Sequence, residues 1–171
     1  MKKPFNLAQA NIARGHAALD DPIMSGFVEQ LEYINSVAER APGFVWRFQT
    51  EEGDATAVRV FGDPLLIFNM SVWESIESLY AYAFESDHRR PMKDRKSWFE
   101  KMDRPHSVMW WIPAGATPTP EEAERRLNQL ATEGPSPNAF TFAKPFDQQG
   151  APIRRSSPTT PDPHTRNPTA R

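Results

Sequence analysis

The sequence predicts one α+β domain of ferredoxin-like type, in which strands and helices follow the order βαββαβ and a further helix is added at the C-terminal end. Three observations predict this class. Short apolar stretches with strand character alternate with amphipathic helical patterns. Turn-forming residues separate these segments. The chain has 171 residues and no cysteine, which suits a single ordinary domain without disulfides.

The first strand and the first helix are expected between residues 5 and 41. Residues 5–12 alternate and become polar at Gln9 and Asn11, which predicts a strand with a polar far end. Asp21 followed by Pro22 favours a helix start. An apolar stripe at helical spacing follows: Ile23, Phe27, Leu31, Ile34 and Ala38. The Pro-Gly pair after this stripe ends the helix.

Three apolar segments separated by turn residues predict strands at 44–49, 57–61 and 65–73. Ser71 with Glu74 resembles a capping box, so a second helix is expected there. Its apolar positions are Ile76, Leu79, Tyr80, Ala83 and Phe84. The basic, aromatic segment 88–102 should be partly helical.

Residues 106–113 predict the last strand, which completes the βαββαβ order. Thr119, Pro120 and Glu122 form the best capping box in the chain, and Gly134 ends the helix that follows it. We expect a later aromatic group to pack this helix back onto the domain: Phe140, Phe142 and Phe146.

The composition divides the chain into a domain at 1–146 and a disordered tail at 147–171, where five of the 17 prolines lie. The tail carries four Arg and two Asp, so 16 basic and 20 acidic side chains remain in residues 1–146. This acidic balance disfavours a nucleic-acid partner. No stretch resembles a signal peptide or approaches the roughly 20 apolar residues of a membrane helix. We therefore expect a soluble, cytoplasmic protein with no membrane partner.

Two predicted strands, which contain LLIF and VMWW, are apolar on both faces. This pattern indicates a sheet that is covered on both sides, whereas the helices of a ferredoxin-like monomer cover one. A homodimer with packed sheets is the simplest explanation. The alternative is that the C-terminal helix wraps around to cover the open face.

No strong catalytic signature is present, so candidate sites come from polar residues that interrupt apolar patterns. Asn69 and Ser71 share one face of their predicted strand. Gln9 and Asn11 lie on the first strand, which neighbours the third in a ferredoxin-like sheet. We expect the four side chains to meet, either as a ligand site or as an internal hydrogen-bond cluster.

Other candidates come from histidine, tryptophan and arginine. His88 extends the apolar stripe of the second helix, which suits a general base or a haem ligand, or else a structural histidine at the helix end. Trp46 and Trp110 are candidates for the wall of a flat-ligand cavity, unless they belong to the core. Arg95 could hold a carboxylate or phosphate, although such basic runs are usually solvated helix faces.

Five phrases of the sequence resemble the bacterial domain of unknown function 3291 family over residues 5–146: FNLAQANIAR, GFVWRFQTEEGDAT, NMSVWESIESL, RKSWFEKMDRP and VMWWIPAG. The resemblance implies the dimeric α/β-barrel superfamily, whose relatives include antibiotic-biosynthesis monooxygenases, haem-degrading enzymes and stress-responsive proteins. In haem-degrading members a histidine near the end of the corresponding helix binds iron, which implies that role for His88. Asn69, Trp73 and Trp46 are counterparts by residue type of pocket-lining residues there.

The leading hypothesis is a monooxygenase-like enzyme that acts on a flat or aromatic small molecule without a tightly bound metal or other cofactor. In this hypothesis Asn69 and His88 are catalytic, with His88 transferring a proton. The substrate-binding residues are Gln9, Asn11, Trp46, Phe68, Ser71, Arg95 and Trp110. One alternative is a haem-binding enzyme with His88 as iron ligand, and another is a non-catalytic stress-response or binding dimer.

Overall fold

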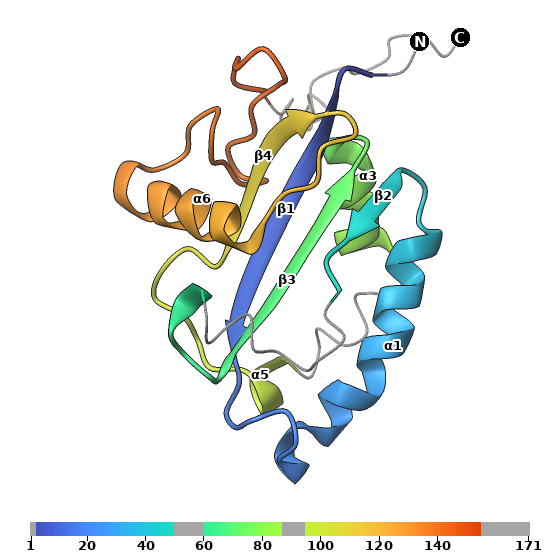
Figure 1. Cartoon of the computed structure of the whole chain (residues 1–171), viewed down its shortest axis with the longest axis vertical. Helices are drawn as coiled ribbons and strands as arrows, with labels where there is room; N and C mark the ends of the chain where they lie inside the picture. Colours follow the sequence, from blue (N-terminus) through green and yellow to red (C-terminus); the bar gives the residue numbers. More distant parts are fainter. Residues whose placement is uncertain (1–2, 50–59, 87–94, 155–171) are drawn as a thin grey trace, which may run out of the picture.

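The computed structural model describes residues 3–49, 60–86 and 95–154, which contain one four-stranded antiparallel sheet (Figure 1). Its strands are β1 (Phe5–Arg14), β2 (Phe44–Arg47), β3 (Leu66–Trp73) and β4 (Ser107–Pro113). Their spatial order is β2-β3-β1-β4. A helix follows β1 and another follows β3, so the chain has the order βαββαβ. This order with antiparallel pairing confirms the predicted ferredoxin-like, α+β class.

Helical segments connect and flank the strands. The 3₁₀ turn η1 (Pro22–Met24) leads into α1 (Ser25–Arg40), and α3 (Ile76–Tyr80) continues into the π-helical turn η2 (Ala81–Glu85). The short α5 (Arg95–Trp98) precedes β4, and α6 (Pro120–Glu133) follows it. Within the three described ranges, no helix is both long enough and apolar enough to cross a membrane.

The first helix begins later than the sequence pattern predicts. Asp21 accepts a hydrogen bond from the Ile23 N–H, as expected of an N-cap, but the turn that it caps is 3₁₀-helical. Ile23 is therefore 53% exposed and does not join the buried stripe. Beyond α1, Gly43 has a φ of 81°, and a Cβ there would lie 2.5 Å from Ser78 Cβ. Only glycine suits both the backbone and this close approach.

Ser75, and not Ser71, caps the second helix. The Oγ of Ser75 accepts a hydrogen bond from the Ser78 N–H at 3.1 Å. The third strand continues past Ser71 because this residue pairs with Gln9 of β1. The capping box predicted from Ser71 and Glu74 is therefore wrong, although a helix follows as expected.

Two predicted segments lie partly outside the described residues. Of the strand predicted at 57–61, only Val60 and Phe61 are described, and both are helical. Phe61 packs its ring against Phe68, with centroids 5.7 Å apart, instead of joining the sheet. In the segment 88–102, residues 95–98 form α5, whereas His88 lies outside the described residues.

The strand register divides the sheet into two faces. The face toward α1 and α3, called the helix-pair face, carries Leu7, Gln9, Asn11, Asn69, Ser71, Trp73, Met109 and Trp111. The opposite face, called the α6 face, carries Ala8, Ala10, Ile12, Met70, Val72, Val108, Trp110 and Ile112. Both faces bury large apolar side chains, so the sheet is covered on both sides as the sequence predicts.

Helix α6 covers the part of the α6 face formed by β1 and β4. Three of its residues belong to the same buried cluster as Trp110: Ala123, Leu127 and Leu130. The C-terminal helix thus covers this part of the second face, as in the alternative explanation, and β1 and β4 need no partner there. Four aromatic side chains on the same face stay only half-buried near β2 and β3: Trp46, Phe48, Phe61 and Phe68. The homodimer remains a prediction.

The start of α6 follows the predicted capping box in part. Thr119 Oγ1 accepts a hydrogen bond from the Glu122 N–H at 3.2 Å, as expected of an N-cap. The carboxylate of Glu122 does not reach back, because it accepts a hydrogen bond from Arg126 Nη2 at 3.1 Å. Gly134, with a φ of 76°, ends the helix as predicted.

The segment after α6 packs against β4 and reaches the helix-pair face (Figure 1, orange). Met109 and Phe140 exchange two backbone hydrogen bonds of 2.8 and 2.9 Å. Trp111 Nε1 donates to the carbonyl oxygen of Phe146 at 2.9 Å. The next turn is closed by Asp147 Oδ1, which accepts from the Ala151 N–H at 2.8 Å. Folded structure therefore extends past the predicted boundary at residue 146, and residues 155–171 lie outside the described part.

Candidate functional site

Four polar side chains lie together on the helix-pair face, and we call them the polar shelf: Gln9, Asn11, Asn69 and Ser71. Gln9 Nε2 donates hydrogen bonds to Asn69 Oδ1 at 3.0 Å and to Ser71 Oγ at 2.7 Å. Gln9 is 8% exposed and Ser71 is 5% exposed, so these bonds satisfy atoms that water scarcely reaches. The four residues meet as the sequence pattern predicts, because β1 and β3 pair Gln9 with Ser71 and Asn11 with Asn69.

Trp73 forms a hydrogen bond with the buried end of the shelf. Its Nε1 donates to Ser71 Oγ at 2.8 Å, so that oxygen accepts from Gln9 and Trp73 at once. The ring of Tyr82, from η2, stacks on Trp73 with centroids 4.9 Å apart and planes inclined by 25°. Burial raises the pKa of Tyr82 to about 12, and the charge of Arg47 opposes this shift. The stack is therefore uncharged at neutral pH.

The opposite end of the shelf is exposed. Asn11 and Asn69 are both solvent-accessible, and within the described ranges the only side-chain hydrogen bond of either is the one that Asn69 Oδ1 accepts from Gln9. Since this bond fixes the oxygen of Asn69, its amino group remains able to donate to another molecule. The shelf thus has a rigid inner end and an outer end that can form hydrogen bonds with a ligand.

An apolar stripe of α1 lies on the same side of the sheet. Ala38 belongs to the buried cluster that contains Trp73, and Phe27, Leu31 and Ile34 share its helix face by their spacing. These three side chains are half-buried. The Phe27 ring already packs against Trp98 and Phe99, with centroids 5.8 and 4.9 Å away, so Leu31 and Ile34 form the part of the stripe that packs against neither buried cluster of the described residues. The helix-pair face therefore offers polar groups on β1 and β3 and apolar groups on α1, and small-molecule sites combine groups of these two kinds.

A groove of about 600 Å³ separates α1 from the α3–η2 pair. Its charged and aromatic lining residues are Tyr33, Arg40, Glu77, Tyr82 and Glu85. Sequence reasoning missed this groove, because it arises from the placement of two helices that are far apart in the chain. The only local signal is a tyrosine within each amphipathic helix pattern.

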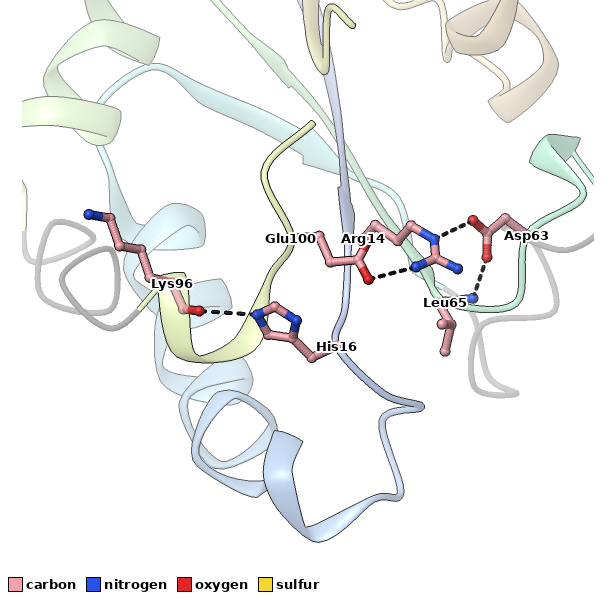
Figure 2. Close-up of polar contacts among 6 residues, drawn as sticks. All are labelled: Arg14, His16, Asp63, Leu65, Lys96 and Glu100. Carbon is pink, nitrogen blue, oxygen red and sulfur yellow. Dashed lines mark hydrogen bonds and ion pairs between the residues drawn. The ribbon is translucent and has the colours of Figure 1, made fainter. Parts of the chain in front are cut away.

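An ion cluster, called the Arg14 clamp, lies at the end of β1 (Figure 2). Arg14 Nε donates to Asp63 Oδ2 and Arg14 Nη1 donates to Glu100 Oε1, both at 2.8 Å. Asp63 Oδ1 also accepts from the Leu65 N–H at 2.9 Å. The hydrogen bond from Leu65, followed by that from Arg14, lowers the pKa of Asp63. The clamp ties β1 to the turn before β3 and to the segment after α5.

Residues 6–156 match a family described as a domain of unknown function, DUF3291. The chain belongs to this family. No curated protein matches the chain. Among solved structures, the DUF3291 chain is similar to SnoaB, a cofactor-independent oxygenase from Streptomyces nogalater, with 15% identity and a TM-score of 0.43; the match covers 66% of this chain and 95% of SnoaB.

Two further solved structures are similar to the DUF3291 chain. PA3566 from Pseudomonas aeruginosa has 8% identity and a TM-score of 0.44, and the match covers 68% of this chain and 99% of PA3566. NE2512 from Nitrosomonas europaea, a protein of unknown function, has 10% identity and a TM-score of 0.43, and the match covers 67% of this chain and 94% of NE2512.

The DUF3291 chain places the predicted wall residues on the wrong side of the sheet for one shared pocket. Trp46, Phe68 and Trp110 lie on the α6 face, whereas Gln9 and Asn69 lie on the helix-pair face. Alternate residues of a strand point to opposite faces, so these two groups cannot line the same cavity. The structure therefore corrects the predicted pocket: the shelf lies on the face of the sheet that carries α1 and α3, and the three predicted wall residues lie on the other face.

Trp110 is a core residue of this chain. It is fully buried beneath α6, and the guanidinium carbon of Arg126 lies 5.8 Å from its ring centroid. Trp110 Nε1 is the one buried side-chain nitrogen or oxygen atom without a hydrogen-bond partner in the described ranges. Trp110 thus contributes packing and does not contact the shelf.

The remaining candidates lie apart from the shelf or outside the described residues. His88 is not among the described residues, so its predicted roles stay predictions. Arg95 lies in α5 with its guanidinium carbon 5.7 Å from the Phe99 ring centroid. His16 is not one of the predicted site residues, and its Nε2 lies 3.1 Å from the carbonyl oxygen of Lys96 (Figure 2). In the part of the chain that is described, no group of three or more His, Asp or Glu residues could hold a metal ion.

Proposed function

We propose that the polar shelf binds a flat, aromatic small molecule and that the protein acts on it as a monooxygenase-like enzyme. The observation that carries this proposal is the nearly buried Gln9 amide, which Asn69 and Ser71 hold on an otherwise apolar sheet. Because two hydrogen bonds already fix this network, it can orient a polar ligand atom without losing much conformational freedom of its own. The apolar stripe of α1 would cover the flat part of the ligand.

Oxygenation at the shelf requires a substrate that supplies its own electrons. In the overall reaction, a CH₂ group conjugated with a carbonyl group and one molecule of O₂ become a new carbonyl group and one molecule of water. The substrate carbon is oxidised and O₂ is reduced, so no external reductant is needed. The Asn69 amino group would stabilise the negative charge on the substrate oxygen after a C–H proton leaves. His88 is the predicted acceptor of that proton.

Anthrone is a suitable probe, because it is a flat three-ring ketone whose oxidation to anthraquinone consumes O₂ and changes the absorption spectrum. We expect O₂ consumption above the spontaneous rate, and a decrease of about tenfold or more in both Asn69→Ala and Gln9→Leu. Asn128→Ala, on the exposed side of α6, is the matched control and should leave the rate unchanged. A wild-type protein without turnover would contradict the proposed reaction, and so would shelf variants that turn over anthrone as fast as the wild type.

Two further measurements separate this proposal from its alternatives. An absorption spectrum with a Soret band that disappears in His88→Ala would favour the haem-binding enzyme. Anthrone binding without O₂ consumption would favour a non-catalytic binding protein. Native mass spectrometry tests the predicted homodimer, whose interface we would place over the half-buried aromatic side chains beside β2 and β3.

A further inference from the structure

We propose that the groove between α1 and the α3–η2 pair binds a small organic cation with a flat apolar body, such as an arylalkylamine. Its volume of about 600 Å³ lies within the range of small-molecule sites. This groove is separate from the polar shelf. Trp73 links the two, because Tyr82 of the groove stacks on its ring while its Nε1 bonds to Ser71 of the shelf.

Among the described residues that line the groove, two carry a negative charge and one carries a positive charge. Glu77 of α3 and Glu85 of η2 are both exposed and line its α3–η2 side. Neither forms an ion pair with another described residue. Arg40, on the α1 side, is bonded back to its own helix, with Nε 3.1 Å from the Ser36 carbonyl oxygen and Nη2 3.3 Å from Ser36 Oγ. These bonds to uncharged oxygens hold the guanidinium on α1 and leave its charge in place, so two carboxylates and one guanidinium give the described lining an excess of one negative charge, which should favour a cation over an anion.

Aromatic and apolar side chains supply the flat walls of the groove. Val37 of α1 and Ala81 of η2 are apolar lining residues. Tyr82 presents a ring whose position is fixed by its stack on Trp73, and Tyr33 is 45% exposed on the α1 side. Aromatic rings attract cations and offer apolar area to a flat ligand. The groove is bordered by η2, a π-helical turn, and such turns are rare and occur often at functional sites.

Three probes with the same ring test the charge preference: phenethylamine, 2-phenylethanol and phenylacetate. We would titrate each into the isotope-labelled full chain and follow backbone amide signals and the Trp73 indole signal by NMR. We expect phenethylamine to shift signals of the groove and of Trp73. The neutral alcohol should bind about fivefold more weakly, and the anion more weakly still. Equal affinities for all three probes, or shifts that lie outside the groove, would overturn the proposal.

Charge-neutralising variants test which residues are responsible. In the double variant Glu77→Gln and Glu85→Gln, phenethylamine should bind no more tightly than 2-phenylethanol, because the two attracting carboxylates are gone. Both residues are exposed, so the variant should fold normally. Glu133→Gln, on α6, makes the same chemical change away from the groove and should leave the affinity unchanged. An unchanged phenethylamine affinity in the double variant would overturn the proposal.

The amine site and the shelf can succeed or fail independently. Gln9→Leu should lower anthrone turnover about tenfold or more and retain phenethylamine binding, since Gln9 does not line the groove. The double variant Glu77→Gln and Glu85→Gln should retain anthrone turnover and lose its preference for phenethylamine. A protein without anthrone turnover that still prefers phenethylamine would retain the groove proposal and reject the proposed function of the shelf.

Discussion

Replacing Ser71 with alanine removes one oxygen that two buried donors share. Ser71 Oγ accepts from Trp73 Nε1 at 2.8 Å and from Gln9 Nε2 at 2.7 Å. Trp73 Nε1 has no other hydrogen-bond partner among the described residues, so leaving it unsatisfied should cost about 1–3 kcal/mol. Gln9 Nε2 loses one hydrogen bond but keeps its bond to Asn69, so this second loss should cost about 1 kcal/mol of the free energy of unfolding. The free energy of unfolding should therefore fall by about 2–4 kcal/mol in total.

Urea unfolding followed by far-UV circular dichroism measures this loss, and the slope of the free energy against urea should stay unchanged. In a Trp73→Phe background, Ser71→Ala should cost only about 1 kcal/mol, because Gln9 alone loses an acceptor. Ser97→Ala, on the exposed surface of α5, is the matched control and should change stability by less than about 0.5 kcal/mol. Equal losses in the two backgrounds would refute the shared-acceptor argument.

Three further substitutions test α6, the connection after α1 and the Arg14 clamp. Thr119→Ala removes the N-cap oxygen of α6 and should lower the free energy of unfolding, measured in urea, by about 1 kcal/mol. Thr119→Ser keeps a capping hydroxyl and should retain most of this stabilisation. Gly43→Ala should cost about 1–3 kcal/mol more than Gly115→Ala in thermal unfolding. Both glycines have positive φ, but only at residue 43 would a Cβ meet Ser78, so equal losses would contradict the clash. The lowered pKa of Asp63 means that its stabilisation is present above the ordinary Asp pKa and is lost as pH falls below it. Unfolding at a series of acidic pH values should therefore show a steeper loss for the wild type than for Asp63→Asn, and parallel curves would exclude this contribution.

Much of the fold was predictable because its signals are local. The Thr119–Pro120 start and the Gly134 end of α6 depend on hydrogen bonds and backbone angles within a few residues. The polar shelf was predictable for a related reason. Alternation along a strand places Asn69 and Ser71 on one face, and the neighbouring position of β1 brings Gln9 beside them.

Two serines close together in the sequence, Ser71 and Ser75, show why the N-cap of the second helix could not be predicted from local sequence. Ser71 and Ser75 both have the chemistry of a helix cap, and only the pairing of β3 with β1 assigns the first to the sheet and the second to α3. The prediction of Trp46 as a pocket wall failed for a similar reason. A register shift between Phe44 and Trp46 places Trp46 on the α6 face, and this shift depends on how β2 pairs with β3.

The sequence by itself determined the βαββαβ order, the capping residues Asp21 and Thr119 and the alternation of polar and apolar positions along the strands. These features follow from backbone and side-chain chemistry over a few residues. Only the tertiary structure decided that α6 covers the second face of the sheet, that Trp73 joins the shelf to Tyr82, and that two helices leave a groove lined by Glu77 and Glu85. Such arrangements depend on packing between residues far apart in the chain, for which local patterns carry no information.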